Sequence, residues 1–331
     1  MNKQELENEE VRQEEKKTKK KKVRKKKTMF GHIRSIISIL LVVGIIGGSY
    51  WYYAFQYRAE VEPETNRKVT NTDSVYTMEQ YLKTLKRNQT VYKYACDEAE
   101  VDNDYGTYVV PGLKSTRTLK VKGDGEAEVC TSMTPQGLAF TEDYILVSAY
   151  CKTKAHDSVI YVIDKESRRF VKEIVLNTKA HVGGMAYDTM NQILWVTGQG
   201  STWAQANAIT LSHLENYSFD DGYHPIEFDM SYNLYKIKRA SFMTYHDGAL
   251  FVGFFTQDNA SVIEKYLINA DGTLYEKEDM NLKRTVGVTE PVAYAVSMQV
   301  ISGKVQGMAF YNNKILLTRS WGILPSEVQI F

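Results

Sequence analysis

Several side chains suited to binding a polar ligand stand at the ends of short apolar runs beyond residue 130. Gln and His hydrogen-bond to polar groups, Trp stacks on sugar faces, and Arg pairs with carboxylate or phosphate. The ligand-binding candidates are Gln136, His156, His181, Gln199, Trp203, Gln306, Arg319 and Trp321. A hydrogen-bonded structural histidine is the competing interpretation of His181, and loop packing is that of Trp203 and Trp321.

Sequence signatures of enzymes are missing. The chain has no nucleophile elbow, P-loop, GxGxxG, HExxH or EF-hand loop, and we assign no catalytic residue and no cofactor. The alternative to a binding protein is a metal-assisted hydrolase of the lactonase or esterase type, with His156 or His181 as general base. Such an enzyme would need several Asp or Glu ligands where the sequence places Gln, His and Ser.

The three cysteines are Cys96, Cys130 and Cys151. Cys130 and Cys151 flank one predicted hairpin, so they are the candidate disulfide, with one thiol left over. The alternative is three buried, unreactive thiols. Because the sequence has no CxxC and no Cys/His group with zinc spacing, it predicts no metal site.

The elements that must position these side chains form an internal repeat. Each copy has a strand with a small or aromatic residue near its start, a tight polar turn and a second apolar strand. The copies lie at residues 135–148, 181–196, 240–253 and 305–318. Their equivalent positions, Gly137, Gly184, Phe242 and Gly307, are 47, 58 and 65 residues apart. Further strands follow the first and third copies, and four antiparallel strands at this spacing are typical of a β-propeller blade. The glycines permit close approach where the first strands crowd the central channel.

Residues 130–331 resemble bacterial membrane-anchored extracytoplasmic β-propeller proteins with YncE- or NHL-like repeats. The motifs that carry the resemblance are Pro135–Ala139, His181–Tyr187 and Val305–Ala309. The resemblance implies an all-β propeller domain over residues 105–331 with at least four recognisable blades. In a propeller, the loops between blades and those after each second strand share one face, so we expect the ligand-binding candidates to gather at one channel mouth.

The four repeats do not by themselves complete a closed ring of blades. Residues 326–331 have the pattern of a third blade strand, so closure needs at least one more strand, for which residues 105–122 are the candidate. We expect the chain to be truncated relative to a parent of six or seven blades. A compact closed ring of four or five blades is the alternative.

An uncharged apolar run precedes this domain. Residues 35–55 contain no charged side chain and end in aromatic residues, which predicts a single transmembrane helix. Ten of the twelve residues 16–27 are Lys or Arg, which by the positive-inside rule places the N-terminus in the cytoplasm. A cleaved signal peptide is the competing interpretation, although the run is long for one and ends in bulky side chains. We expect residues 1–34 to be a disordered tail and residues 56–104 a stalk with one short helix over residues 75–95.

The N-terminal segment and the rest of the chain also differ in net charge. Residues 1–34 hold 13 Lys and Arg against 6 Glu, so of the 41 basic and 40 acidic side chains the remainder keeps 28 and 34. An acidic body argues against binding of nucleic acid by the folded part. The sequence thus predicts a membrane-tethered extracytoplasmic binding or scaffold module, with a polar or anionic glycan, a peptide or a partner protein as ligand.

Overall fold

The computed structural model describes residues 3–52, 83, 86–87, 89–92, 110, 113, 115–121, 123, 125–167, 169–276, 291–322 and 326–331. The chain divides into two compact units, Met1–Glu60 and Val61–Phe331, and each is described by itself. Most of the predicted stalk, including Cys96, lies outside the described residues. Its described part contains the short helix α3 (Gln89–Tyr92).

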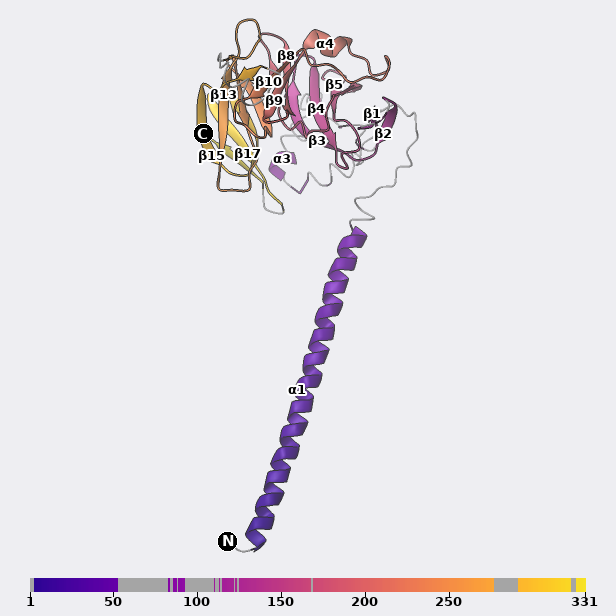
Figure 1. Cartoon of the computed structure of the whole chain (residues 1–331), viewed down its shortest axis with the longest axis vertical. Helices are drawn as coiled ribbons and strands as arrows, with labels where there is room; N and C mark the ends of the chain where they lie inside the picture. Colours follow the sequence, from indigo (N-terminus) through magenta and orange to yellow (C-terminus); the bar gives the residue numbers. More distant parts are fainter. Residues whose placement is uncertain are drawn as a thin grey trace. The chain divides into compact units, whose positions relative to one another are not determined.

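The described part of the first unit is one helix, α1 (Lys3–Tyr52), shown in indigo in Figure 1. This differs from the disorder expected for residues 1–34. Lys and Glu are strong helix formers, the segment has no Gly or Pro before Gly31, and pairs such as Glu15 and Lys19 lie one turn apart. Residues Gly31–Trp51 form a stretch of mean hydropathy 1.9, none of it buried. That stretch is long and apolar enough to span a membrane, and a signal sequence has the same character.

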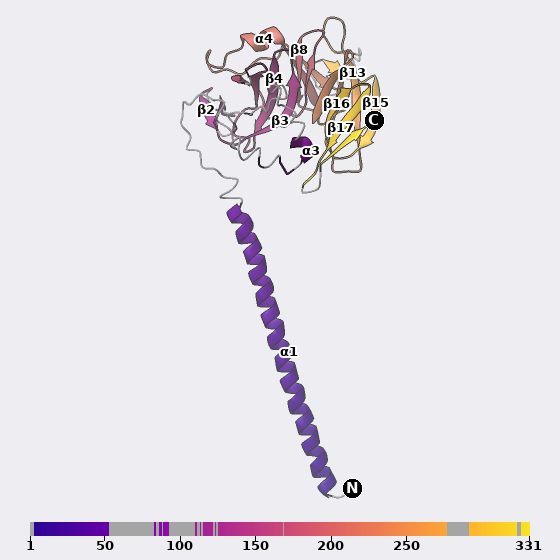
Figure 2. The same cartoon turned by 180° about the vertical axis from the view of Figure 1, so that it is seen from behind.

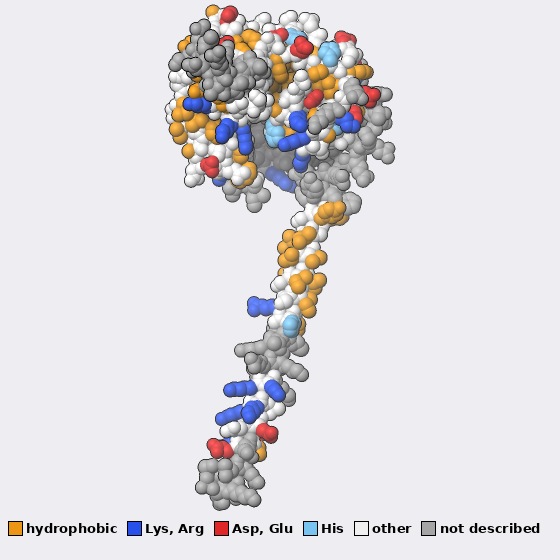
Figure 3. All heavy atoms as spheres, in the orientation of Figure 1, with side chains coloured by type: hydrophobic (Ala, Val, Ile, Leu, Met, Phe, Trp, Pro, Cys, Tyr) orange, Lys and Arg blue, Asp and Glu red, His pale blue; other side chains and the backbone are white. Residues whose placement is uncertain are grey.

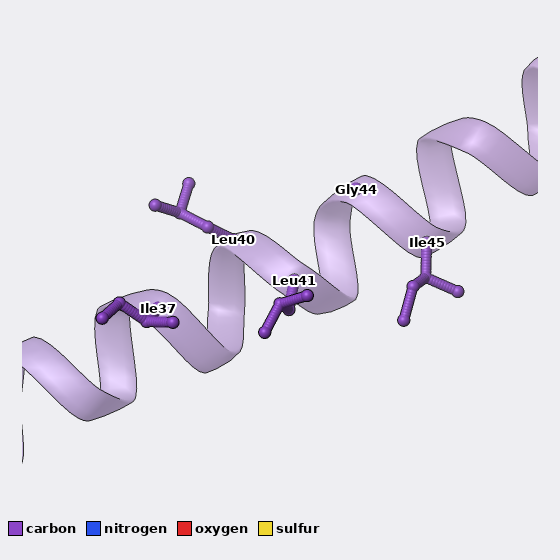
Figure 4. A pocket seen from close by; sticks show the side chains of 5 residues that line it. All are labelled: Ile37, Leu40, Leu41, Gly44 and Ile45. Carbon is purple, nitrogen blue, oxygen red and sulfur yellow. The ribbon is translucent and has the colours of Figure 1, made fainter.

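Gly44 interrupts the apolar surface of α1. Without its side chain a shallow hollow of about 400 Å³ opens between Ile37, Leu40, Leu41 and Ile45, as Figure 4 shows. A Cβ added at Gly44 would meet nothing within 4 Å. The side chains around the hollow are exposed, as they would be on a helix solvated by lipid.

The second unit contains four successive sheets, which follow one another in chain order from magenta to yellow in Figures 1 and 2. The first blade contains β3 (Met133–Phe140), β4 (Tyr144–Cys151), β5 (Val159–Asp164) and β6 (Phe170–Val175). The second contains β7 (Met185–Asp188), β8 (Ile193–Gln199), β9 (Ala204–Thr210) and β10 (Met230–Leu234), with helix α4 (Leu211–Asn216) between the last two. The third contains β11 (Phe242–His246), β12 (Ala249–Gly253), β13 (Ala260–Leu267) and β15 (Ser297–Ser302). The fourth contains β16 (Val305–Tyr311), β17 (Lys314–Arg319) and β18 (Glu327–Ile330).

These sheets make the domain a β-propeller with four recognisable blades, which confirms the predicted fold. Within each blade successive strands are antiparallel neighbours, and the first strands pack in the order β3, β7, β11, β16. Apolar clusters fill the spaces between blades, with Tyr161, Trp195 and Tyr266 as the largest fully buried side chains. Strands β9, β10 and β15 were not recognised in the sequence.

One strand ties the second blade to the third. After β13 the chain returns to the second blade, where β14 (Val292–Ala293) pairs in parallel with β10. Val292 packs there with Trp203, which is 8% exposed and meets the Tyr235 ring edge-on at 5.3 Å between centroids. Trp203 thus packs against its neighbours in the structure, and its role in ligand binding stays a prediction.

The glycines of the repeat permit close contact between backbones. A Cβ at Gly137 would lie 2.7 Å from Ser148 Oγ and 3.0 Å from the carbonyl oxygen of Gly183 in the next blade. A Cβ at Gly183 would lie 2.4 Å from the carbonyl oxygen of Ser241, one blade further. In the third blade the glycine is on the second strand instead of the first, because the Phe242 ring on the first strand covers Gly253 on the second. The crowding expected at the first strands is thus present in the structure.

The segment proposed to close the ring has another partner. Strand β1 (Thr116–Leu119) pairs with β2 (Ala127–Cys130) in a separate two-stranded sheet, so the expectation that residues 105–122 complete the fourth blade was wrong for the described strand. A hydrogen bond of 2.5 Å between Thr116 and Tyr161 and the side chain of Arg117 hold β1 against the first blade.

Arg117 neutralises a buried carboxylate. Its guanidinium lies 2.9 Å from Glu173 on β6, whose side chain is 4% exposed, and 2.6 Å from Asp220. Burial raises the pKa of Glu173, and the charge and hydrogen bonds of Arg117 oppose that rise. The Arg117–Glu173 pair therefore contributes most to the stability of the fold at pH values where Glu173 is ionised.

We predict that Gly183→Ala lowers the stability of the domain by about 1–3 kcal/mol, because the new Cβ meets backbone that cannot move without shifting the adjacent blade. Thermal melting of the full chain followed by circular dichroism measures the change. Gly307→Ala is the matched control, because its Cβ would meet only the Thr318 hydroxyl at 2.9 Å. Equal losses in both variants would contradict the backbone contact as the cause.

We predict that Arg117→Met destabilises the protein by about 3 kcal/mol at neutral pH, because it leaves Glu173 charged and buried without its partner. A folded-state pKa raised above the unfolded one favours the protonated carboxyl, so the loss should shrink as the pH falls through the folded pKa of Glu173. Melting curves at a series of pH values test this. Adding Glu173→Gln should recover most of the loss; a pH-independent loss would rule out the electrostatic cause.

Candidate functional site

Four of the predicted ligand-binding residues meet at one cavity of the propeller. Gln136, His181, Gln199 and Gln306 all line a hollow of about 710 Å³, here called the inner cavity. They come from four places far apart in the sequence. Gln136 lies on β3, His181 between β6 and β7, Gln199 at the end of β8, and Gln306 on β16. Two first strands, one blade entry and the end of one second strand bring them together, as the propeller topology predicts, although their role in binding stays a prediction.

Basic side chains surround the same cavity. Lys154 from the β4–β5 loop, Lys179 from the β6–β7 segment and Arg239 before β11 are exposed and line it. Among the lining residues that the structure describes there is no Asp or Glu. Figure 3 shows Lys and Arg side chains and a histidine gathered around a hollow on one face of the domain. Such a surface attracts anions and repels divalent cations.

His181 is held by its neighbours rather than by a hydrogen bond to a carboxylate. Its ring stacks on Tyr150, with 3.9 Å between centroids and 19° between planes. Partial burial, together with the charge of Lys154, lowers the pKa of His181 from its ordinary value of 6.5. The ring is therefore neutral at pH 7, when it can both donate and accept hydrogen bonds, and it gains charge only in more acidic solution.

The remaining candidates lie outside the lining of the inner cavity. Arg319 donates to the carbonyl oxygen of Gly303 at 2.8 Å and pairs with Glu327 at 3.1 Å, so its guanidinium joins strands of the fourth blade. Trp321 is 41% exposed and packs on Phe255 at 5.4 Å between ring centroids. Because Phe255 lines the cavity, Trp321 is one contact away from it.

Sequence reasoning missed the three basic residues of the cavity. Lys154, Lys179 and Arg239 stand in polar stretches where many Lys and Arg side chains occur, so their type carries no signal. Their position before or after a blade strand is the feature that could have identified them. For Arg239, the segment that leads into β11 corresponds to the segment that carries His181 into β7.

His156 lies with the two cysteines instead of with the cavity residues. Its Nδ1 is 3.4 Å from Cys151 Sγ, and its Nε2 is 3.2 Å from a carboxylate oxygen of Glu128. Cys130 and Cys151 are buried, free thiols in the structure, so the disulfide between them stays a prediction. Burial raises the pKa of Cys130. Burial also acts to raise the pKa of Cys151, but its hydrogen bonds with Thr153 and His156 are the leading causes that lower it on balance.

Comparisons with known proteins give only distant structural similarity. No family model and no curated protein matches the sequence. Similar solved structures include the glutaminyl cyclase of Myxococcus xanthus, with 13% identity and a TM-score of 0.35 over 62% of this chain and 76% of that one. The hydrazine synthase of Kuenenia stuttgartiensis has 13% identity and a TM-score of 0.37, over 62% of this chain and 53% of that one. The WD40 repeats of RRP9 have 11% identity and a TM-score of 0.35, over 62% and 60%. At these identities the likeness concerns the fold alone, and the activities of those proteins do not transfer.

Proposed function

We propose that the protein is a membrane-tethered binding module whose propeller holds an anionic glycan in the inner cavity. The observation that carries the proposal is the meeting of Gln136, His181, Gln199 and Gln306 with exposed basic side chains in one hollow. Propellers commonly bind ligands at the mouth of the channel, where loops from several blades converge.

The chemistry of the cavity favours a carboxylated or phosphorylated sugar. Lys154, Lys179 and Arg239 supply positive charge without a nearby lining carboxylate, and three Gln side chains supply both donors and acceptors for hydroxyl groups. Phe255 at the wall, backed by Trp321, offers an aromatic surface for a sugar face. A carboxylate-bound metal, which the hydrolase alternative requires, finds no such ligands in the lining that the structure describes.

The N-terminal helix supports the tether. Its 21-residue apolar stretch is long enough to cross the roughly 30 Å hydrocarbon core. The Lys- and Arg-rich segment before it favours a cytoplasmic N-terminus, which would place the propeller outside the cytoplasm. A module in that location meets cell-surface glycans, which include polymers rich in carboxylate and phosphate groups.

We predict that the full chain in detergent binds oligogalacturonate, a carboxylated oligosaccharide, and binds its methyl-esterified, uncharged form more weakly. Isothermal titration calorimetry measures both affinities. The double variant Lys179→Gln with Arg239→Gln should weaken binding of the charged form roughly fivefold, at about 0.5 kcal/mol for each exposed charge. Lys314→Gln, at the exposed start of β17 in the fourth blade, is the control that leaves affinity unchanged.

The pH dependence of the same titration tests His181. Because the pKa of His181 is lowered, the ring becomes charged only as the pH falls below its ordinary value of 6.5, so affinity for the carboxylated ligand should rise toward pH 5. His181→Gln should flatten that rise. Equal affinity for the charged and esterified forms would contradict an anion site, and binding of neither would turn the search to peptides and partner proteins.

We predict that the uncleaved chain is recovered from membranes with its N-terminus inside. In bacterial cells freed of their wall, external protease should digest an epitope at the C-terminus and spare one at the N-terminus. Permeabilised cells, in which both epitopes are digested, are the control. A shortened protein released into the medium would show instead that the apolar helix is a cleaved signal.

A further inference from the structure

A cluster of two cysteines and one histidine joins the β1–β2 sheet to the first blade. Cys130 ends β2, Cys151 ends β4, and His156 lies five residues beyond Cys151, bridged to Lys120 after β1. Their sulfur and ring-nitrogen atoms lie within 4.8 Å of one another. Cys130 and Cys151 are 0% and 1% exposed, and the His156 side chain is 14% exposed.

The spacing of these atoms suits a tetrahedral metal ion. Zinc binds sulfur at about 2.3 Å and nitrogen at about 2.0–2.1 Å, which sets a sulfur and a nitrogen ligand about 3.6 Å apart. In the structure Cys151 Sγ and His156 Nδ1 are 3.4 Å apart. The Ser132 hydroxyl lies 3.7 Å from Cys130 Sγ and 3.6 Å from Cys151 Sγ, where it can donate a hydrogen bond to a bound thiolate.

The surroundings of His156 supply a second, independent observation. Its Nε2 lies 3.2 Å from Glu128 Oε2, and its Nδ1 lies 3.4 Å from Cys151 Sγ. A carboxylate that accepts from Nε2–H favours the neutral tautomer whose Nδ1 lone pair can bind a metal ion. Histidines that bind metals commonly donate their other nitrogen to a carboxylate in this way. Lys120 pairs with the other oxygen of Glu128 at 3.0 Å and holds that carboxylate in place.

We propose that Cys130, Cys151 and His156 bind a thiophilic divalent cation, Zn²⁺, with Glu128 as the positioning residue of the histidine. Three protein ligands leave a fourth position for water or another donor. The ion joins β2 to the end of β4 and so fastens the β1–β2 sheet to the first blade. It also fixes both ends of the loop that carries Lys154 to the inner cavity.

Cobalt is the probe that tests this site, because Co²⁺ replaces Zn²⁺ and reports sulfur ligands by its absorption. Reduced, metal-free full chain in detergent should bind one Co²⁺ with a thiolate-to-cobalt charge-transfer band and the strong visible bands of a tetrahedral ion. One equivalent of Zn²⁺ should abolish both bands. Zinc should also raise the melting temperature, because it binds the folded state.

Variants assign the ligands. Cys130→Ser and Cys151→Ser should each lose the charge-transfer intensity of one sulfur and most of the affinity. Glu128→Gln, at a partly exposed position, should weaken Zn²⁺ binding about 10- to 100-fold. His213→Gln is the matched control, because His213 pairs with Asp229 at 2.9 Å and is not part of the cysteine cluster. Cys96→Ser controls for the third thiol.

Three results would each overturn the proposal. The first is that the folded, reduced chain shows no sulfur-to-cobalt band. The second is that the Cys130→Ser and Cys151→Ser variants bind the metal as tightly as the unaltered chain, and the third is that Glu128→Gln behaves like His213→Gln. Mass spectrometry after alkylation without reductant adds a check on the same atoms. A Cys130–Cys151 disulfide that persists in the isolated protein, with no metal bound after reduction, would assign the pair to a covalent crosslink instead.

Discussion

Contact between the backbones of neighbouring blades is the constraint on which the propeller depends. At Gly137 and Gly183 the first strand or entry segment of one blade lies against carbonyl oxygens of the next, too close for a Cβ. The Ser148 hydroxyl completes the contact, because it accepts from Gly137 N–H and donates to the carbonyl of Val182. Blades that touch in this way cannot pivot independently, and the side chains at their entries converge on one hollow.

The inner cavity follows from that convergence. Residues on or before the first strands of all four blades reach the inner cavity, so Gln136, His181 and Gln306 become neighbours although they span most of the domain. Lys154 lies in the loop between β4 and β5, and Arg239 lies in the segment before β11. The basic, carboxylate-free lining that the structure describes is therefore the combined product of several blades.

Beside the four blades, the β1–β2 sheet is attached by polar contacts as well as by the apolar packing of Leu119 and Cys130. Arg117 meets a buried carboxylate on β6, Thr116 meets Tyr161, and Cys130 faces Cys151 and His156. These contacts replace the ladder that this segment was expected to form with the fourth blade. They also place a cluster of sulfur and imidazole ligands at the base of a loop that reaches the inner cavity.

The sequence by itself determined the apolar helix, the four repeats and the positions of their glycines, because hydrophobic runs, turn residues and repeat spacing are local properties. It also predicted that Gln136, His181, Gln199 and Gln306 converge, since propeller topology requires it. Only the tertiary structure decided that Arg319 pairs with Glu327, that Trp203 packs against Tyr235, and that His156 lies beside the cysteines. Those outcomes depend on which distant segments meet, such as β2 with the end of β4, and no local pattern encodes such a meeting.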